Sequence, residues 1–222
     1  MDNEADRCRI RWIVDLEAEK ASGCLRQLLT LLPEHEQQQV LCFLQPTDQD
    51  RALISRLLQR CCVCIALGIK WEDVALALTK GRKPFTTNSK PVFAPNFNYN
   101  VSHEGRYVAI ASDPMYLVGV DVAAPRCGRT GPEAAGRPLD QYLHSFRGQL
   151  AESEWALLEQ LAPDEGQREA TFQRLWSLKE AFIKARGDGL GFQPLSRAAF
   201  EFPDGDPWAS SAKLVLDGEL QN

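Results

Sequence analysis

Apolar residues recur at helical spacing most clearly between residues 48 and 67. The positions that carry this pattern are Leu53, Ile54, Leu57, Leu58, Cys61, Val63, Cys64 and Ile65. Spacing of this kind predicts an amphipathic helix that buries one face in a core. Asp48 or Asp50 can cap the start of this helix with a side-chain oxygen, and Gly68 follows its predicted end.

Helical patterns also occur on both sides of this stretch. They predict helices at residues 18–32, 34–44, 151–161 and 167–186. Pro33 is suited to open the second of these helices, because the first helical N–H has no partner within the helix.

Short extended runs predict the strands. They lie at residues 9–16, 71–78, 91–93, 97–101, 107–112, 117–122, 197–202 and 213–216. A loop rich in proline and glycine covers residues 123–138. Because helices precede strands twice along the chain, we expect an α+β protein with antiparallel sheets and two similar halves. These halves are residues 1–115 and 116–222.

The composition narrows the class of protein. The 222 residues are 44% hydrophobic and 9% aromatic, which is typical of a globular chain with a sizeable core. The formal net charge of -5 argues against a broad nucleic-acid surface, because such surfaces need clustered Lys and Arg. The N-terminal segment lacks the features of a signal peptide, and no apolar run is long enough to span a bilayer.

Cysteine usage predicts a reducing compartment. The chain has seven cysteines, an odd number in a chain much larger than a disulfide-stapled mini-domain. We therefore expect a cytosolic protein. Cys61 and Cys64 have C-x-x-C spacing, but they lie within an apolar helical run and no second pair exists at metal-site distance. Packing in the core is therefore favoured over a metal site.

The helix predicted at residues 167–186 carries three charged residues in a special arrangement. At 100° per residue, its apolar arc consists of Phe172, Leu175, Trp176, Leu178, Phe182 and Ile183. Glu180 and Lys184 lie one turn apart on a flank of this arc, which suits an ion pair or a shared ligand. Lys179 points near the middle of the arc and therefore needs an anion or a path to solvent. The alternative is an ordinary amphipathic helix with one surface ion pair.

Three segments resemble the motifs of one enzyme family. Residues 176–190, WSLKEAFIKARGDGL, resemble the W-x-x-K-E-[SA]-x-x-K-x-x-G-x-G-L signature of 4′-phosphopantetheinyl transferases. Residues 119–122, GVDV, are similar to the family's G-[IV]-D motif, and residues 97–103, FNYNVSH, to its F-N-[IV]-S-H strand. The resemblance is nearest to the Sfp-like subgroup of two-half monomers, which includes a eukaryotic broad-specificity transferase linked to lysine metabolism.

The resemblance implies a pseudo-two-fold fold and a reaction. In this reaction, phosphopantetheine moves from coenzyme A to a serine of an acyl or peptidyl carrier protein, and 3′,5′-ADP is released. Asp121 and Glu180 are implied as ligands of Mg²⁺, which prefers oxygen donors. Glu180 would also accept the serine proton, directly or through a metal-bound water. Lys184 would stabilise or protonate the leaving phosphate.

The same resemblance implies contacts with coenzyme A. The residues concerned are Lys80, Arg82, Lys83, Asn100, Ser102, His103 and Lys179. For Lys179, either a pyrophosphate or a carboxylate is the expected partner. A lone histidine is more often a structural hydrogen-bonding group, and a short basic run is as often a solvated loop, so these alternatives stay open for His103 and for residues 80–83.

The chain departs from the family pattern in three places. Ala123 stands where many relatives have the acidic residue of a D-x-E motif, so one metal ligand is absent and a water can take its place. Gln37, Gln38 and Gln39 occupy the region where relatives carry an arginine for the 3′-phosphate. Relatives continue with further strands after the segment KLVLDGEL, so the resemblance implies a second half that is incomplete at its C-terminus.

These departures leave more than one function open. The first is an active transferase that modifies carrier proteins. The second is a non-catalytic protein that keeps the binding of coenzyme A or of the carrier, and a third, remote one is an unrelated α+β scaffold. Since a two-half chain can form its own cleft, we expect a monomer that binds neither nucleic acid nor membranes.

Overall fold

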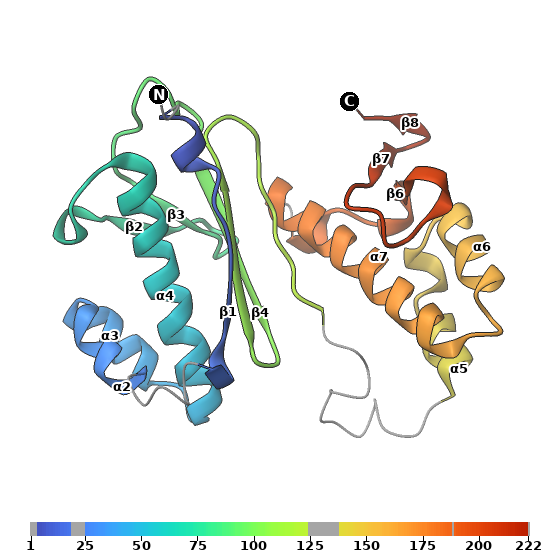
Figure 1. The fold of residues 1–222 in the computed structure, drawn as a ribbon, viewed down its shortest axis with the longest axis horizontal. Helices are drawn as coiled ribbons and strands as arrows, with labels where there is room; N and C mark the ends of the chain where they lie inside the picture. Colours follow the sequence, from blue (N-terminus) through green and yellow to red (C-terminus); the bar gives the residue numbers. More distant parts are fainter. Residues whose placement is uncertain (1–3, 19–24, 124–137, 188, 222) are drawn as a thin grey trace. The chain divides into compact units, whose positions relative to one another are not determined.

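The computed structural model describes residues 4–18, 25–123, 138–187 and 189–221 (Figure 1). The chain divides into two compact units. Unit 1 consists of Met1–Val122 together with Lys184–Gly187, and unit 2 consists of Ala123–Ile183 together with Asp188–Asn222. The division falls inside a long helix, so the C-terminal end of that helix is grouped with unit 1.

In the part that the structure describes, unit 1 combines helices with two antiparallel sheets. Residues 16–18 are helical, and the helices with both ends described are α2 (Leu25–Leu28), α3 (Glu34–Leu41) and α4 (Pro46–Leu67). The strands are β1 (Arg11–Asp15), β2 (Leu76–Leu78), β3 (Pro84–Thr86), β4 (Asn98–Glu104) and β5 (Tyr107–Asp113). The larger sheet has the order β1-β5-β4, and β2 pairs with β3. Short 3₁₀ turns are η1 (Asp6–Cys8), η2 (Leu29–Leu31) and η3 (Trp71–Asp73).

The helix α4 organises the core of unit 1. Pro46 occupies its first turn, and Gly68 ends it in the left-handed conformation, where its N–H donates to the Cys64 carbonyl at 2.9 Å. One face of α4 packs with the β1-β5-β4 sheet around the buried Phe97 and Tyr99 (Figure 1). Cys64 is part of this packing, as the sequence predicts.

Unit 2 is built around one long helix and a small sheet. The helices are α5 (Leu139–His144), α6 (Glu152–Gln160) and α7 (Glu165–Arg186). The antiparallel sheet has the order β6 (Ala198–Glu201), β7 (Lys213–Leu216) and β8 (Glu219–Leu220). Its 3₁₀ turns are η5 (Arg147–Gln149), η6 (Gly189–Gly191), η7 (Leu195–Arg197) and η8 (Pro203–Gly205). Phe172 and Leu175 of α7 are fully buried against α5 and α6.

The predicted α+β class with antiparallel sheets is confirmed, and several predicted elements need correction. The strand expected at 71–78 begins with the turn η3, and its extended part is β2. Residues 91–93 form a turn, closed by the N–H of Ala94 on the Pro91 carbonyl at 2.9 Å. A helix was expected at 18–32, and its C-terminal part consists of α2 followed by η2. Most of the loop expected at 123–138 lies outside the described residues.

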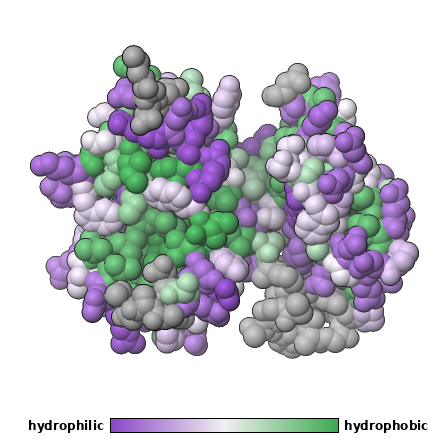
Figure 2. Space-filling model, viewed as in Figure 1, coloured by the Kyte–Doolittle hydropathy of each residue, from purple (hydrophilic) through white to green (hydrophobic). Residues whose placement is uncertain are grey.

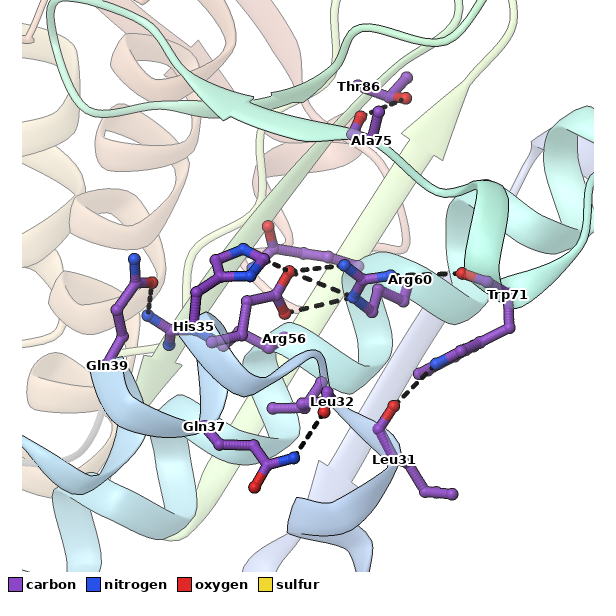
Figure 3. A network of polar contacts seen from close by, with 12 residues as sticks. Leu31, Leu32, His35, Gln37, Gln39, Arg56, Arg60, Trp71, Ala75 and Thr86 are labelled. Carbon is purple, nitrogen blue, oxygen red and sulfur yellow. Dashed lines mark hydrogen bonds and ion pairs between the residues drawn. The ribbon is translucent and has the colours of Figure 1, made fainter.

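A buried ion pair links α3 to α4 in unit 1 (Figure 3). The Arg60 guanidinium donates to the Glu36 carboxylate at 2.7 and 3.2 Å, and both side chains are buried. Arg60 also donates to the Trp71 carbonyl at 3.3 Å, and the Trp71 indole donates to the Leu31 carbonyl at 2.8 Å. Since every charge here is paired and hydrogen-bonded, the network fixes how α3 packs on α4.

The surface of unit 1 carries apolar side chains, seen as green areas in Figure 2. Large apolar side chains that are exposed in this unit include Ile13, Leu31, Leu41, Phe43, Leu44 and Val92. Single exposed apolar residues are common on protein surfaces and need no special explanation. Within the described residues, no helix is both long and apolar enough to cross a membrane.

Candidate functional site

A ladder of side-chain hydrogen bonds runs along β4. Three alternate residues of this strand accept hydrogen bonds from the backbone of a following segment. The acceptors are Asn98 Oδ1, Asn100 Oδ1 and Ser102 Oγ, and the donors are the N–H groups of Val118, Val120 and Val122 at 3.0, 2.9 and 3.4 Å. The strand predicted at 117–122 therefore has the right two-residue period, but side chains replace the backbone ladder. The last of these bonds, at Val122, adjoins Asp121.

Three residues from three separate motifs meet at this end of the ladder. The Ser102 hydroxyl donates to Asp121 Oδ1 at 3.2 Å and accepts from Lys184 Nζ at 2.8 Å. Lys184 also forms an ion pair with Asp121 at 2.5 Å. The Asp121 side chain is 10% exposed, so this carboxylate is nearly buried beside a cation. The cluster thus places one ammonium and one carboxylate against the same hydroxyl, in charge-assisted hydrogen bonds.

A histidine and an arginine add to the electrostatics of this cluster. Burial lowers the pKa of His103, and the positive charges of Arg51 and Lys184 lower it further. The imidazole is therefore neutral at pH 7. Arg51 is held by Asp48 at 2.8 Å and donates to the Gly105 carbonyl at 2.8 Å. Sequence analysis missed Arg51, because its only signal in the sequence is an i, i+3 pair with Asp48, and such pairs are common on helices.

The charge of Lys184 should be detectable at His103. Replacing Lys184 with methionine is expected to raise the pKa of His103, because one of the positive charges that disfavour the imidazolium is removed. Proton NMR of the imidazole across a pH titration at low salt measures this shift. The change Lys213→Met in β7 serves as the control, and an unchanged pKa in the Lys184 variant would contradict the arrangement.

The basic cluster lies at the tip of the β2–β3 hairpin, in the turn that the sequence predicts. Two backbone hydrogen bonds of 2.9 Å close this turn: the N–H of Arg82 donates to the Thr79 carbonyl, and the N–H of Thr79 donates to the Lys83 carbonyl. Arg82 has a positive φ of 62°. Lys80 and Arg82 are exposed. Lys83 instead donates to the Ala185 carbonyl at 3.2 Å, and burial lowers its pKa. Lys83 thus satisfies a carbonyl at the C-terminal end of α7, where a cation is favoured.

Lys179 is buried inside unit 2. It is 1% exposed and donates to the Leu195 carbonyl at 3.0 Å and the Ala198 carbonyl at 2.5 Å. Its ion pair is with Glu154 at 2.8 Å. Of the two partners expected for Lys179, the structure has the carboxylate. Since an ammonium has three N–H donors and all three are used within the protein, none is left for a pyrophosphate.

Glu154 is the centre of this buried network. One carboxylate oxygen accepts from the N–H of Phe200 at 2.9 Å, and the other accepts from the N–H of Ala151 at 2.8 Å and from Lys179. The carboxylate thereby satisfies the first turn of α6 and joins α6, α7 and β6. It is a structural group whose partners are far apart in the sequence.

Glu180 follows Lys179 directly and precedes Lys184 by one helical turn of α7. Its side chain is half-buried. In the part of the chain that the structure describes, no group of three or more His, Cys, Asp or Glu side chains could hold a metal ion. Mg²⁺ needs fewer protein ligands, because it keeps several waters and often uses one or two carboxylates. Asp121, with the Ser102 hydroxyl beside it, fits this chemistry.

The glutamines of α3 take part in packing (Figure 3). Gln37 donates to the Leu32 carbonyl at 2.7 Å, and Gln39 accepts from Arg56 of α4 at 3.0 Å. Burial lowers the pKa of Arg56. Arg56 is therefore an arginine in this region that the sequence analysis did not single out.

Comparison with known proteins gives consistent matches along the chain. Residues 20–115 match the family model described as 4′-phosphopantetheinyl transferase, N-terminal, and residues 117–220 match the 4′-phosphopantetheinyl transferase superfamily.

Individual relatives match over most of the chain. L-aminoadipate-semialdehyde dehydrogenase-phosphopantetheinyl transferase of Rattus norvegicus is 32% identical over 86% of this chain and 60% of its own length. The enzyme with the same name from Xenopus laevis is 35% identical over 75% and 52% of the two chains. A phosphopantetheinyl transferase of Thraustochytrium is 31% identical over 84% and 62%. The chain thus spans less than two thirds of the length of these relatives.

Proposed function

Because this chain belongs to the 4′-phosphopantetheinyl transferase superfamily, we propose that it transfers 4′-phosphopantetheine from coenzyme A to a serine of an acyl or peptidyl carrier protein. The second product is 3′,5′-ADP, and the activity is of the holo-[acyl-carrier-protein] synthase type. One observation carries the proposal. Ser102, Asp121 and Lys184, from three separate sequence motifs, form one hydrogen-bonded cluster.

The carboxylates of Asp121 and Glu180 are the proposed ligands of Mg²⁺. When bound, this ion would offset the negative charge of the pyrophosphate of coenzyme A. Ala123 removes a further carboxylate from this set, and a water is the proposed substitute.

The remaining chemistry is assigned to side chains of this chain. The serine hydroxyl attacks the phosphorus bonded to pantetheine, and the bond between this phosphorus and the bridging oxygen of 3′,5′-ADP breaks. Glu180 accepts the serine proton. Lys184 stabilises the charge that develops on the leaving phosphate, which is the main demand of phosphoryl transfer.

Coenzyme A is proposed to bind through groups of unit 1. Lys80 and Arg82 at the exposed hairpin tip would bind the nucleotide phosphates, and Lys83, which donates to the Ala185 carbonyl, would add to the positive charge there. Asn100 and Ser102 order the backbone of the 118–122 segment. The neutral His103 donates or accepts a hydrogen bond at the phosphates without adding a charge.

The proposed setting is the cytosol, with the protein acting as a monomer. The cysteines that the structure describes are free thiols, which is consistent with a reducing compartment. Size-exclusion chromatography with light scattering would test the monomer.

The test is a transfer assay. The chain is incubated with coenzyme A, Mg²⁺ and several apo carrier proteins, and the carriers are then weighed by intact mass spectrometry. We expect a gain of one phosphopantetheine unit on at least one carrier. A carrier with its acceptor serine replaced by alanine, and a reaction with chelator, are the controls. Binding of coenzyme A without a mass gain would contradict the transferase and support the non-catalytic alternative.

A further inference from the structure

The segment that carries Asp121 is held on unit 1 by side chains. In the described part of the chain, residues 117–122 belong to no strand. Each acceptor in β4 lies 20 residues before the N–H that it binds, so the segment runs parallel to β4. The position of this segment therefore depends on the side chains of β4 that accept its N–H groups, and not on a backbone ladder.

Asn98 holds the start of this segment through both ends of its amide. Its Oδ1 accepts from the Val118 N–H at 3.0 Å, and its Nδ2 donates to the Tyr116 carbonyl at 2.8 Å. The same Nδ2 donates to the Asn96 carbonyl at 3.0 Å, which fixes the amide on its own side. Because an amide offers an acceptor and a donor in one plane, Asn98 fixes both the position and the direction of the chain that it binds.

Asn100 provides the firm contact next to Asp121. Its Oδ1 accepts from the Val120 N–H at 2.9 Å, and the residue is 4% exposed, so water competes little for this bond. The following contact, from the Val122 N–H to Ser102 Oγ, is longer at 3.4 Å. The Ser102 hydroxyl is also engaged with two charged side chains of the cluster. A hydroxyl shared in this way holds the backbone weakly, so Asn100 carries more of the hold than Ser102 does.

We infer that Asn98 and Asn100 are positioning residues that set the affinity of Asp121 for a divalent cation. This inference rests on the proposed function, which assigns the cation to Asp121. A carboxylate on an ordered segment binds a cation without a further loss of backbone freedom, whereas a loose segment must first be ordered. Removing a group that orients a metal ligand typically lowers metal affinity about 10- to 100-fold. The two asparagines act through the backbone of residues 116–121.

Asn88 offers a matched control within unit 1. Its Oδ1 accepts from the Ala75 N–H, and its Nδ2 donates to the Asp73 carbonyl, both at 2.8 Å. These contacts repeat those of Asn98 on a segment that carries no residue of the proposed site, and both asparagines are half-buried. Asn88→Leu should therefore lower the melting temperature about as much as Asn98→Leu does, without an effect on the cation.

The experiment uses Mn²⁺ as the probe, because it prefers the same oxygen ligands as Mg²⁺. The full chain is titrated with Mn²⁺ in the presence of coenzyme A and without a carrier, and free Mn²⁺ is followed by electron paramagnetic resonance, corrected for Mn²⁺ bound by coenzyme A alone. We expect Asn98→Leu and Asn100→Leu to weaken Mn²⁺ binding at least about tenfold, and Asn88→Leu to change it less than about twofold. Amide hydrogen exchange should become faster at Val118 in Asn98→Leu and at Val120 in Asn100→Leu.

The possible results separate the inference from the proposed function. If the wild type binds Mn²⁺ and modifies carriers while the Asn98 and Asn100 variants keep its Mn²⁺ affinity, the inference is wrong and the transferase stands. An equal loss of Mn²⁺ affinity in Asn88→Leu would trace the effect to general destabilisation and also overturn the inference, as would a wild type that modifies carriers without binding Mn²⁺. Since Asn98 is half-buried, its variant decides the question even where Asn100→Leu does not fold. If the wild type neither binds Mn²⁺ nor modifies any carrier, the proposed function and the inference both fail.

Discussion

Replacing Glu154 with alanine is expected to lower the free energy of unfolding by about 3–5 kcal/mol. The change leaves the Lys179 ammonium at 1% exposure with two carbonyl partners and no counter-charge. It also removes the acceptor of the Ala151 and Phe200 N–H groups. A buried charge without its partner costs far more than the pair contributes, so the loss should be among the largest from any single substitution in unit 2.

The pH dependence of the lost stability in Glu154→Ala tests whether the unpaired charge of Lys179 is its cause. Burial lowers the pKa of Lys179, and the Glu154 carboxylate opposes that shift, so the variant should have a still lower pKa at Lys179. Between the Lys179 pKa of the folded variant and that of the folded wild type, the variant binds fewer protons, so its stability rises with pH relative to the wild type. Urea unfolding followed by circular dichroism should show the penalty shrinking as the pH rises through this window, which lies below the ordinary lysine pKa.

Two further variants complete the test. The pair Glu154→Leu with Lys179→Met removes both charges and should recover much of the lost stability. Glu152→Ala breaks an exposed ion pair with Arg147 on the same helix and should leave unfolding nearly unchanged. A pH-independent loss in Glu154→Ala, equal to that of the double variant, would mean that packing and not the buried charge is responsible.

The helix α7 shows how far sequence reasoning reaches. Its apolar arc and the burial of Lys179 follow from helical periodicity, because these depend on residues within the helix. The partner of Lys179 does not follow, because Glu154 lies on another helix and meets it through tertiary packing. The sequence therefore indicates that a buried lysine needs an anion but leaves open which one.

The candidate site shows the same limit. The sequence singled out Ser102, Asp121 and Lys184 through separate motifs, and the structure brings the three together. Arg51 was missed, since its influence on His103 depends on how α4 packs beside β4. The alternating pattern of residues 117–122 predicted a strand. In the structure this extended segment has the same two-residue period, but its N–H groups donate to side chains of β4 and not to a neighbouring backbone, a difference that the pattern does not reveal.

Replacing Lys184 with methionine is expected to lower kcat about 100-fold or more, while the affinity for coenzyme A falls much less. The ammonium is needed most when charge develops on the leaving phosphate, so its loss should affect the transition state more than the bound substrate. Lys213→Met is the control for loss of a lysine. An equal loss in kcat and in coenzyme A affinity would show that Lys184 serves in binding and not in the chemical step.

The ion pair with Asp121 gives the same variant a second, opposite effect. In the structure the Lys184 ammonium lies against the carboxylate that is proposed to hold Mg²⁺. Removing this positive charge should strengthen the binding of a divalent cation at Asp121, because like charges repel across a nearly buried site. The Mg²⁺ concentration for half-maximal activity should therefore fall in Lys184→Met and rise in Asp121→Asn. Since a general loss of folding would weaken both kcat and metal binding, a higher Mg²⁺ requirement in Lys184→Met would contradict the proposed roles of this pair.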